Sequence, residues 1–483
     1  MTSVFGVDLT SVKLHVDDSA SRAATAMGVE AYSVGNHISF APGRFDPASR
    51  HGRHVLAHEV AHTLASPALH GVHAFEGPEH RDAGDQGPRD LVRFLGTPEG
   101  AAWAQQLGYD PALLLADLGG DPFVQQPDRR MIVGAGRQAH QEGQRLTPGE
   151  AISLSGDIFE PERIGKAPTK TIRDVLEIFD RQKAGLLHGA EADVAIEKAT
   201  GGDYSERAKD NLPHFASLGP TVEGMRPTLR DNRSEWQRLH QLALAKAREA
   251  SQATAARERT NTLDEAYLLD AAGGHFLTDA FSAGHLIDPI RIEAAATIYL
   301  RVHPLDNRAN PEADPIALGL DQAGLLVKLV LKNLHDRLNR EGFMVRNGKG
   351  LRWKAFGDGH LEATSESMKV MSLAVLLSRR QVAHAYDGSL REDESAAEQI
   401  LDLLPDRDTI QRATDDAISK MPDAVSDVMP LINRSVGMVG AGNKKVLRAL
   451  QPYLDTVTSP DRSKQLEQAK DRGGIAPQLT WRF

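Results

Sequence analysis

The chain has 483 residues, of which 41% are hydrophobic and 25% charged, which is the composition of a globular protein rather than of a disordered or fibrous one. It contains no cysteine, which excludes disulfides, thiolate catalysis and thiolate metal sites. Any metal ion would therefore be bound by His, Asp, Glu or Asn. The 56 Lys and Arg against 66 Asp and Glu give a net charge of −10, which argues against binding of nucleic acid or anionic lipid by the whole surface.

Targeting signals are the next feature that the sequence limits. No segment has the roughly 18 uncharged apolar residues that a membrane helix needs, so we expect no stable membrane insertion. The N-terminal segment, Met1 to Asp8, lacks the basic region and apolar run of a secretory signal peptide. We therefore expect synthesis in the cytoplasm, with any export achieved by something other than the general route.

The first 90 residues combine strands, one helix and a long loop. Alternating residues predict short strands at Val12–Val16 and His37–Phe40, the second preceded by a turn at Gly35-Asn36. Apolar residues at helical spacing predict a helix over about 49–65, which Pro67 ends. Residues 66–90 are rich in Gly, His, Asp and Pro, and we expect a loop there that contains a domain boundary.

The rest of the chain has a helical pattern. We expect helices over about 99–108, 111–118, 171–185, 189–199, 234–258, 262–283, 316–341 and 364–385. Arg379-Arg380 is expected to be a solvated helix end. The predicted fold class is mainly α: a small α+β N-terminal domain over residues 1–75, a large all-α domain over 76–390, and a helical C-terminal extension over 391–483.

Two histidines four residues apart define the first candidate metal site. On a helix, His58 and His62 share a face and present two imidazoles to one zinc ion, while Glu59 lies close enough to act as general base. This is the zincin arrangement, so we expect a zincin-like N-terminal domain. A third ligand would come from the polar residues after Pro67, and no spacing selects among Glu76, Glu79 and His80. The alternative is a helix that carries these polar side chains without a metal ion.

Residues 5–65 resemble the metallopeptidase-like domain at the head of many cargo toxins of extracellular contractile injection systems. The segments that carry the resemblance are Phe5-Gly6-Val7-Asp8-Leu9, Val12-Lys13-Leu14-His15, Ala31-Tyr32, Gly35 to Gly43, and Gly52 to Leu64. The chain departs from the family at Ala65-Ser66, where members often have two Gln residues. The resemblance implies a toxin or effector that is loaded into the tube or baseplate lumen of the injection particle through this domain and delivered into a target cell.

A second candidate metal site lies in the segment Gly274 to His285. His275 and Asp279 share a face of the helix expected over 262–283, and His285 follows just past Gly284, which we expect to end that helix. Two histidines and one carboxylate suit a divalent ion, zinc first. The alternative is an amphipathic helix with its polar residues in solvent.

This spacing, His-x-x-x-Asp followed by His after five residues, resembles the zinc-dependent phospholipase C and fungal single-strand nuclease superfamily. The superfamily is all-helical and has a trinuclear zinc cluster. A larger bacterial branch also shares the segment from Trp353 to Gly359. The resemblance spans residues 76–385 at most and is close only over 275–285.

The resemblance implies further zinc ligands at positions that match in chain order: Asp203, His214, His335 and Asn339. Asn339 departs from the family, which has a carboxylate there. An N-terminal histidine is also implied, with His80 as candidate and His188 and His240 as alternatives. Asp157 is a further possible ligand from its residue type, although a helix-capping or turn role is favoured.

Three hypotheses for function follow. The first is a zinc-dependent phosphodiester hydrolase in which Asp203 orients the nucleophile as general base, acting on a phospholipid or a nucleic acid. The aromatic content of 5% favours lipid, because binding of single strands relies on stacking. The second is a metallopeptidase whose helical body holds the substrate, and the third is a non-enzymatic, particle-associated protein with structural metal ions.

Overall fold

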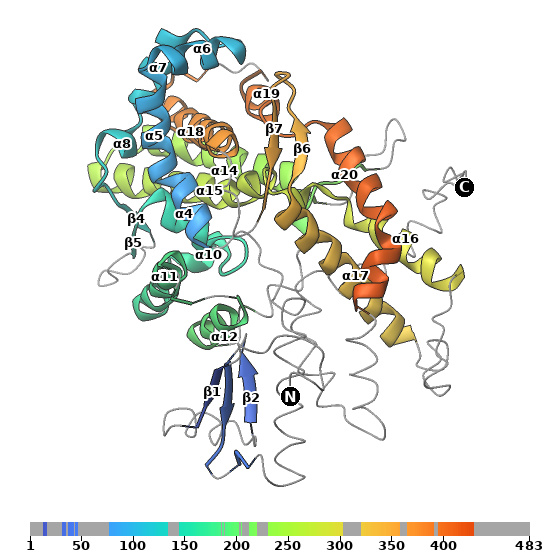
Figure 1. Cartoon of the computed structure of the whole chain (residues 1–483). Helices are drawn as coiled ribbons and strands as arrows, with labels where there is room; N and C mark the ends of the chain where they lie inside the picture. The colour runs from blue at the N-terminus through green and yellow to red at the C-terminus, as the bar shows by residue number, and fades with distance from the viewer. Residues whose placement is uncertain are drawn as a thin grey trace. The chain divides into compact units, whose positions relative to one another are not determined.

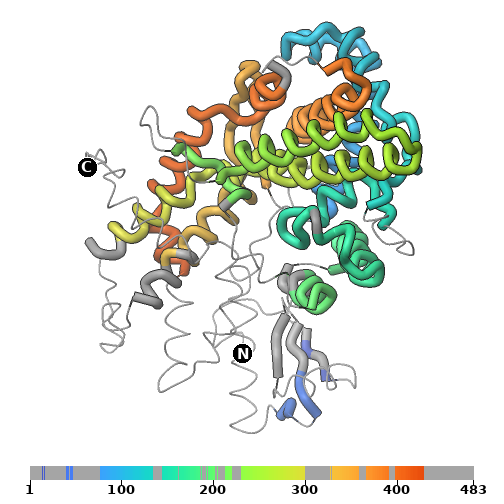
Figure 2. Tube along the Cα trace, turned by 180° about the vertical axis from the view of Figure 1, so that it is seen from behind, coloured from blue at the N-terminus to red at the C-terminus, as the bar shows by residue number. Residues whose placement is uncertain are grey.

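A computed structural model describes residues 13–16, 31–34, 37–42, 44–46, 77–133, 144–184, 186–187, 189–201, 204, 212–219, 230–302, 320–357, 365–390 and 395–428 (Figures 1 and 2). The chain divides into two compact units, Met1–Gly71 with Leu187–Val194, and Val72–Leu186 with Ala195–Phe483. The described residues are mostly helical, which confirms the mainly α fold class. The domain boundaries expected at residues 75 and 390 stay predictions.

The first unit contains a three-stranded sheet in the order β1-β3-β2. Strand β3 (His37–Phe40) pairs parallel with β1 (Lys13–His15) and antiparallel with β2 (Ala31–Val34). Phe40 is buried and meets the ring of Phe45 edge to face at a centroid distance of 5.0 Å. These strands confirm the alternation seen in the sequence. The helix predicted over 49–65, with His58, Glu59 and His62, lies outside the described residues.

The second unit is built around helix α15 (Ala256–Asp279). Helix α14 (Asn232–Gln252) forms a hairpin with it, and α18 (Ser365–Asp387) packs against both, as Figures 1 and 2 show. Helices α4 (Gly77–Gly84) and α9 (Pro148–Leu154) also pack against α15. Every residue from Asp270 to Asp279 is buried, which is typical of a helix enclosed on all sides. Polar side chains in this stretch are therefore removed from water.

The other described helices precede α14 or follow α15 in the chain. The N-terminal helices are α5 (Gln86–Leu95), α6 (Pro98–Gln106), α7 (Pro111–Gly119), α8 (Pro122–Gln125), α10 (Pro161–Ile164), α11 (Thr169–Lys183) and α12 (Gly189–Thr200). The later ones are α16 (Pro289–Val302), α17 (Leu320–Glu341), α19 (Ser395–Leu401) and α20 (Arg407–Ser419). Two antiparallel hairpins complete the described part, β4 (Met131–Val133) with β5 (Gln144–Leu146), and β6 (Phe343–Arg346) with β7 (Arg352–Ala355).

The loop expected over residues 66–90 is wrong from Gly77 onward, where α4 and α5 begin. The glycines there serve close helix packing rather than turns. A Cβ atom added at Gly84 would lie 2.6 Å from the Cα atom of Gly149 in α9, and one at Gly77 would lie 2.4 Å from the Phe179 ring. The sequence pattern also missed α9, α16 and both hairpins. None of the described helices is long and apolar enough to cross a membrane.

The close contact between α4 and α9 gives a stability prediction. Gly84→Ala should lower the free energy of unfolding by about 1–3 kcal/mol, because the added methyl group overpacks a backbone contact. Gly119→Ala, on helix α7 where no described atom lies within 4 Å of the added Cβ, is the matched control and should be neutral or stabilising. Denaturant unfolding of both variants measures the difference, and equal effects would contradict the packing argument.

The sequence predicted that Arg379 and Arg380 form a solvated helix end, and this prediction is wrong. Both lie inside α18, and the Arg379 side chain is only 4% exposed. It donates hydrogen bonds from Nε and Nη2 to the two carboxylate oxygens of Asp121, at 2.7 and 3.0 Å. A bidentate pair of this kind satisfies a guanidinium group that water cannot reach.

Candidate metal centre

A cluster of histidine and acidic side chains lies at the C-terminal end of α15. Its members come from five places in the second unit. They are His80 on α4, Asp157 in the turn after α9, His214 on the 3-10 helix η2 (Leu212–His214), His275 and Asp279 on α15, and His285 on η3 (Ala283–Leu286). All except Asp157 are buried. His335 and Asn339 on α17 continue the row of buried polar side chains.

The end of α15 explains how these residues meet. The helix ends at Asp279, five residues before Gly284, so the expectation that Gly284 terminates it is wrong. Gly284 lies inside η3 instead, where a Cβ atom would approach Asn339 Oδ1 to 2.4 Å. The carbonyl of His285 accepts a hydrogen bond of 2.8 Å from the Ala216 backbone N–H, which holds the His214 segment beside η3.

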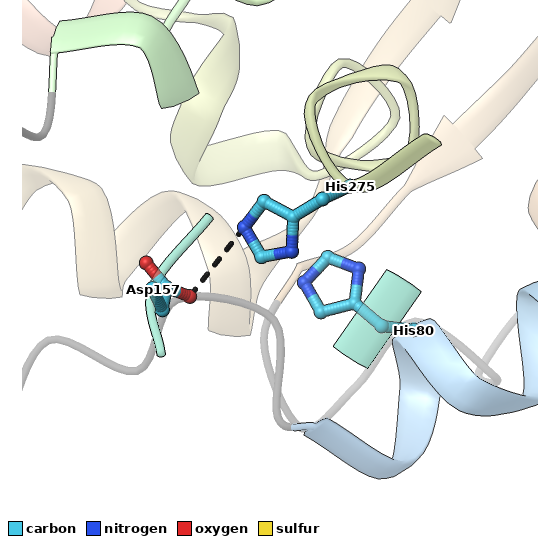
Figure 3. Close-up of side chains that lie close together, drawn as sticks. All are labelled: His80, Asp157 and His275. Atoms are coloured by element: carbon cyan, nitrogen blue, oxygen red, sulfur yellow. Dashed lines mark ion pairs between the residues drawn. The ribbon is translucent and has the colours of Figure 1, made fainter. Parts of the chain in front are cut away.

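Two groups of three side chains could each hold a metal ion, His80/Asp157/His275 and His214/His275/Asp279. Within each group the ligand atoms lie within 4.8 Å of one another, and His275 belongs to both. Figure 3 shows the first group, with His275 Nε2 lying 3.6 Å from Asp157 Oδ2. When two ligand atoms bind one zinc ion at about 2.0–2.1 Å, the distance between them is close to this separation of 3.6 Å between His275 and Asp157.

Hydrogen bonds outside the cluster fix which ring nitrogens face it. His275 Nδ1 lies 3.2 Å from the Ile152 carbonyl and can only donate to it, which leaves Nε2 with its lone pair toward the cluster. The Thr278 hydroxyl donates to the carbonyls of Gly274 and His275, so it accepts from His80 Nδ1 at 2.8 Å. His80 Nε2 then also carries a lone pair. Metal-bound histidines are oriented in this way by their second nitrogen.

Burial sets the protonation states of the cluster. Loss of hydration lowers the pKa of His80 well below its usual value, with the neighbouring His275 adding to the effect, and it also lowers the pKa of His275. Burial opposes protonation of His214 too, but the carboxylates of Asp157 and Asp279 outweigh it and raise its pKa. The pKa of Asp279 is held well below its ordinary range, because His275, His285 and His214 outweigh the effect of burial. His80 and His275 are therefore neutral beside an ionised Asp279, as metal binding requires, whereas His214 would have to lose its proton to bind an ion.

The hydrogen bonding of Asp279 shows whether the side chains of the cluster are suited to bind a cation. Oδ2 lies 2.7 Å from His214 Nδ1, whereas no described group donates a hydrogen bond to the buried Oδ1. Oδ1 lies 3.4 Å from His285 Nδ1 and 3.7 Å from His80 Nε2. A buried carboxylate oxygen without a donor is costly, and a divalent ion would satisfy it. The donor set of histidine nitrogens and carboxylate oxygens fits zinc.

Asp157 belongs to this cluster, although the sequence favoured a capping or turn role for it. Its neighbour Gly156 adopts a φ of +68°, and a Cβ atom there would lie 2.2 Å from Cδ2 of His275. The turn can therefore close onto the His275 ring only with glycine, and this places the Asp157 carboxylate 3.5 Å from His214 Nε2. The Gly-Asp pair directly after a short buried helix was the signal available in the sequence.

Other predicted residues lie elsewhere or are not described. His240 stacks on Trp236 and hydrogen-bonds to Asp270 at 2.9 Å, away from the two groups. Glu79 is buried on α4 and belongs to neither group. Asp203, His188 and Glu76 lie outside the described residues, as do the three residues of the zincin motif. Their expected roles stay predictions.

Comparisons with known proteins bear on the first unit. Residues 1–68 match the eCIS core domain, which associates the chain with an extracellular contractile injection system. No curated protein and no solved structure matches the chain. The match covers His58, Glu59 and His62 but none of the residues in the cluster.

The Gly156 turn gives a prediction about metal affinity. Gly156→Ala should weaken zinc binding by the roughly 10- to 100-fold that loss of a supporting contact costs, because the methyl group displaces His275 or the turn that holds Asp157. Gly201→Ala is the matched control, since Gly201 has the same φ of +68° but no described atom within 4 Å of the added Cβ. Competition with a zinc chelator measures both affinities. If the two variants bind zinc alike, the contact with His275 does not matter.

Proposed function

We propose that the second unit is a zinc-dependent phosphodiester hydrolase and that the chain is a toxin or effector carried by a contractile injection system. The observation that carries the proposal is the cluster of His80, His214, His275 and Asp279, which are buried, with the partly exposed Asp157; these residues form two overlapping groups able to hold metal ions. The association with the injection particle rests on the eCIS core domain. The resemblance of residues 275–285 to the phospholipase C and nuclease superfamily supplies the reaction class.

The roles of the residues follow from their surroundings. When bound, divalent ions in such a centre neutralise phosphate charge and make water a stronger nucleophile. His275 has one lone pair facing the cluster, on Nε2, so it would bind an ion of one group at a time, and the other ligands of the two groups would hold a second ion. Asp157, with a side chain 19% exposed, is the most accessible member, so the phosphate would approach from its side. Asp203 remains our candidate for the general base.

The substrate we favour is a phospholipid head group. The low aromatic content offers few platforms for stacking bases, and the net charge of −10 gives nucleic acid no general attraction. Among the described residues no helix spans a membrane, so the enzyme would act on a head group at the lipid surface.

The experiment is a hydrolysis assay on the purified full chain. Phosphatidylcholine vesicles and single-stranded DNA are offered separately, with and without EDTA, and after zinc is added back. We expect release of phosphocholine that EDTA abolishes and zinc restores. Cleavage of DNA alone would assign the centre to a nuclease, and failure to hydrolyse either substrate by zinc-loaded protein would overturn the proposal.

The zincin motif supports a second candidate, a metallopeptidase, because it lies within the eCIS core domain match. Glu59→Gln separates the two functions, since it removes the general base of a peptidase but leaves the cluster in the second unit untouched. Under our proposal, toxicity of the chain produced inside target cells should be unchanged. The measurement compares the number of cells that survive production of the variant with the number that survive production of the unaltered chain. Loss of toxicity in the variant would favour the peptidase.

A further inference from the structure

The row of buried polar side chains continues beyond Asp279 to His285, His335 and Asn339. We propose that this end of the centre holds no metal ion and is closed by a hydrogen-bonded pair, His335 and Asn339. The centre would then hold at most two ions, at the groups His80/Asp157/His275 and His214/His275/Asp279. The inference rests on the proposed function only in taking metal ions to bind these two groups.

The side-chain amide of Asn339 is already committed. Its Oδ1 accepts hydrogen bonds from the Gly284 backbone N–H and from Ser282 Oγ, the latter at 3.1 Å. A backbone N–H can only donate, so the amide atom that faces it must be the oxygen. The amide nitrogen therefore faces His335, 3.3 Å from Nε2. An amide nitrogen has no lone pair to offer a metal ion, and the oxygen would have to give up two donors.

His335 is held in the orientation that accepts this amide. Its Nδ1 lies 3.0 Å from the carboxylate of Asp336, which also pairs with Lys332. Nδ1 must donate to that carboxylate, so Nε2 carries the lone pair and accepts from Asn339. Both ring nitrogens of His335 thus have partners within α17, and a metal ion would have to displace one of them.

The backbone also fills the space around the amide. A Cβ atom at Gly357 would lie 1.7 Å from Asn339 Oδ1, and one at Gly284 would lie 2.6 Å from His335 Cδ2. Two backbone segments therefore approach this pair as closely as only glycine allows, and they hold the Asn339 amide in the orientation that its hydrogen bonds require.

The charges of the residues also argue against a metal ion at His335 and Asn339. Among the described residues, the two metal groups contain two carboxylates, Asp157 and Asp279, whereas Asn339 is neutral. A third divalent ion would add two positive charges in a buried site without a further carboxylate to offset them. Asn339 instead joins η3 to α17 through the hydrogen bond that it accepts from the Gly284 backbone N–H.

Counting zinc by mass spectrometry tests the inference on the full chain carrying His58→Ala and His62→Ala, so that the zincin motif contributes no ion. We expect no more than two zinc ions per chain. His335→Gln should leave that number unchanged, and His275→Gln should lower it. Three ions per chain, or loss of an ion in His335→Gln, would overturn the inference.

Hydrolysis measured on the same samples keeps this inference apart from the proposed function. Three zinc ions with hydrolysis would overturn the closed end of the centre but keep the enzyme. Two zinc ions without hydrolysis of lipid or DNA would overturn the proposed hydrolase but support the inference that no ion binds at His335 and Asn339. A chain that binds no zinc would overturn the proposed function and the assumption, on which the inference rests, that the two groups bind metal ions.

Discussion

Asp279→Asn should abolish phosphodiester hydrolysis and the toxicity that depends on it. Asp279 is fully buried and lies beside three histidines of the cluster, with Oδ2 2.7 Å from His214 Nδ1. The amide keeps the shape of the side chain but removes the negative charge that a divalent ion needs. We expect hydrolysis to fall by more than the roughly 10- to 100-fold that loss of an outer partner costs, because Asp279 would bind the ion itself. Zinc content per chain should fall with it.

Asp270→Asn is the matched control for this substitution. Asp270 is also a buried aspartate of α15, but its carboxylate accepts hydrogen bonds from Ser378 and pairs with His240. This variant should lose stability while it keeps its zinc, because Asp270 belongs to neither metal group. Full hydrolysis by Asp279→Asn, or equal loss of zinc in the two variants, would remove the cluster from the chemistry.

Most long helices of the second unit were predicted from the sequence, because they have an apolar stripe with helical spacing; α16 is the exception. The patterns around 171–185 and 364–385 correspond to α11 and α18. Helices α4 and α9 were missed because their glycines, such as Gly84 and Gly149, pack against each other rather than forming turns. No periodicity reveals a contact of this kind, since it depends on a partner far away in the chain.

Only part of the candidate site was likewise predicted from the sequence. His275 and Asp279 were predicted from their spacing on one helix, which is a local property. Asp157 joins them across 118 to 122 residues of chain, because a positive φ at Gly156 lets its turn reach α15. The Gly-Asp pair can be recognised in the sequence, but its contact with His275 cannot. The helix end misassigned to Gly284 has a similar cause, since that glycine accommodates Asn339 on another helix.

Arg379→Met should lower the free energy of unfolding by about 3–5 kcal/mol, the range for breaking a buried ion pair from one side. The substitution leaves the Asp121 carboxylate buried and without its cation, and Asp121 is itself 0% exposed. It also removes the hydrogen bond of 2.9 Å from Arg379 Nη1 to the carbonyl of Gly84, at the end of the helix that carries His80. Urea unfolding followed by circular dichroism measures the loss.

Arg380→Met is the neighbouring control. Arg380 pairs with Asp117 at 3.0 Å, but Asp117 is one-third exposed, so water can replace the arginine and the cost should stay within about 1 kcal/mol. The double variant Asp121→Asn with Arg379→Met should recover part of the stability lost in Arg379→Met, because it removes the uncompensated charge while an amide oxygen can still cap α8. If Arg379→Met cost no more than Arg380→Met, burial would not govern the strength of this pair. If the double variant were no more stable than Arg379→Met, the loss would come from packing rather than from the charge left behind.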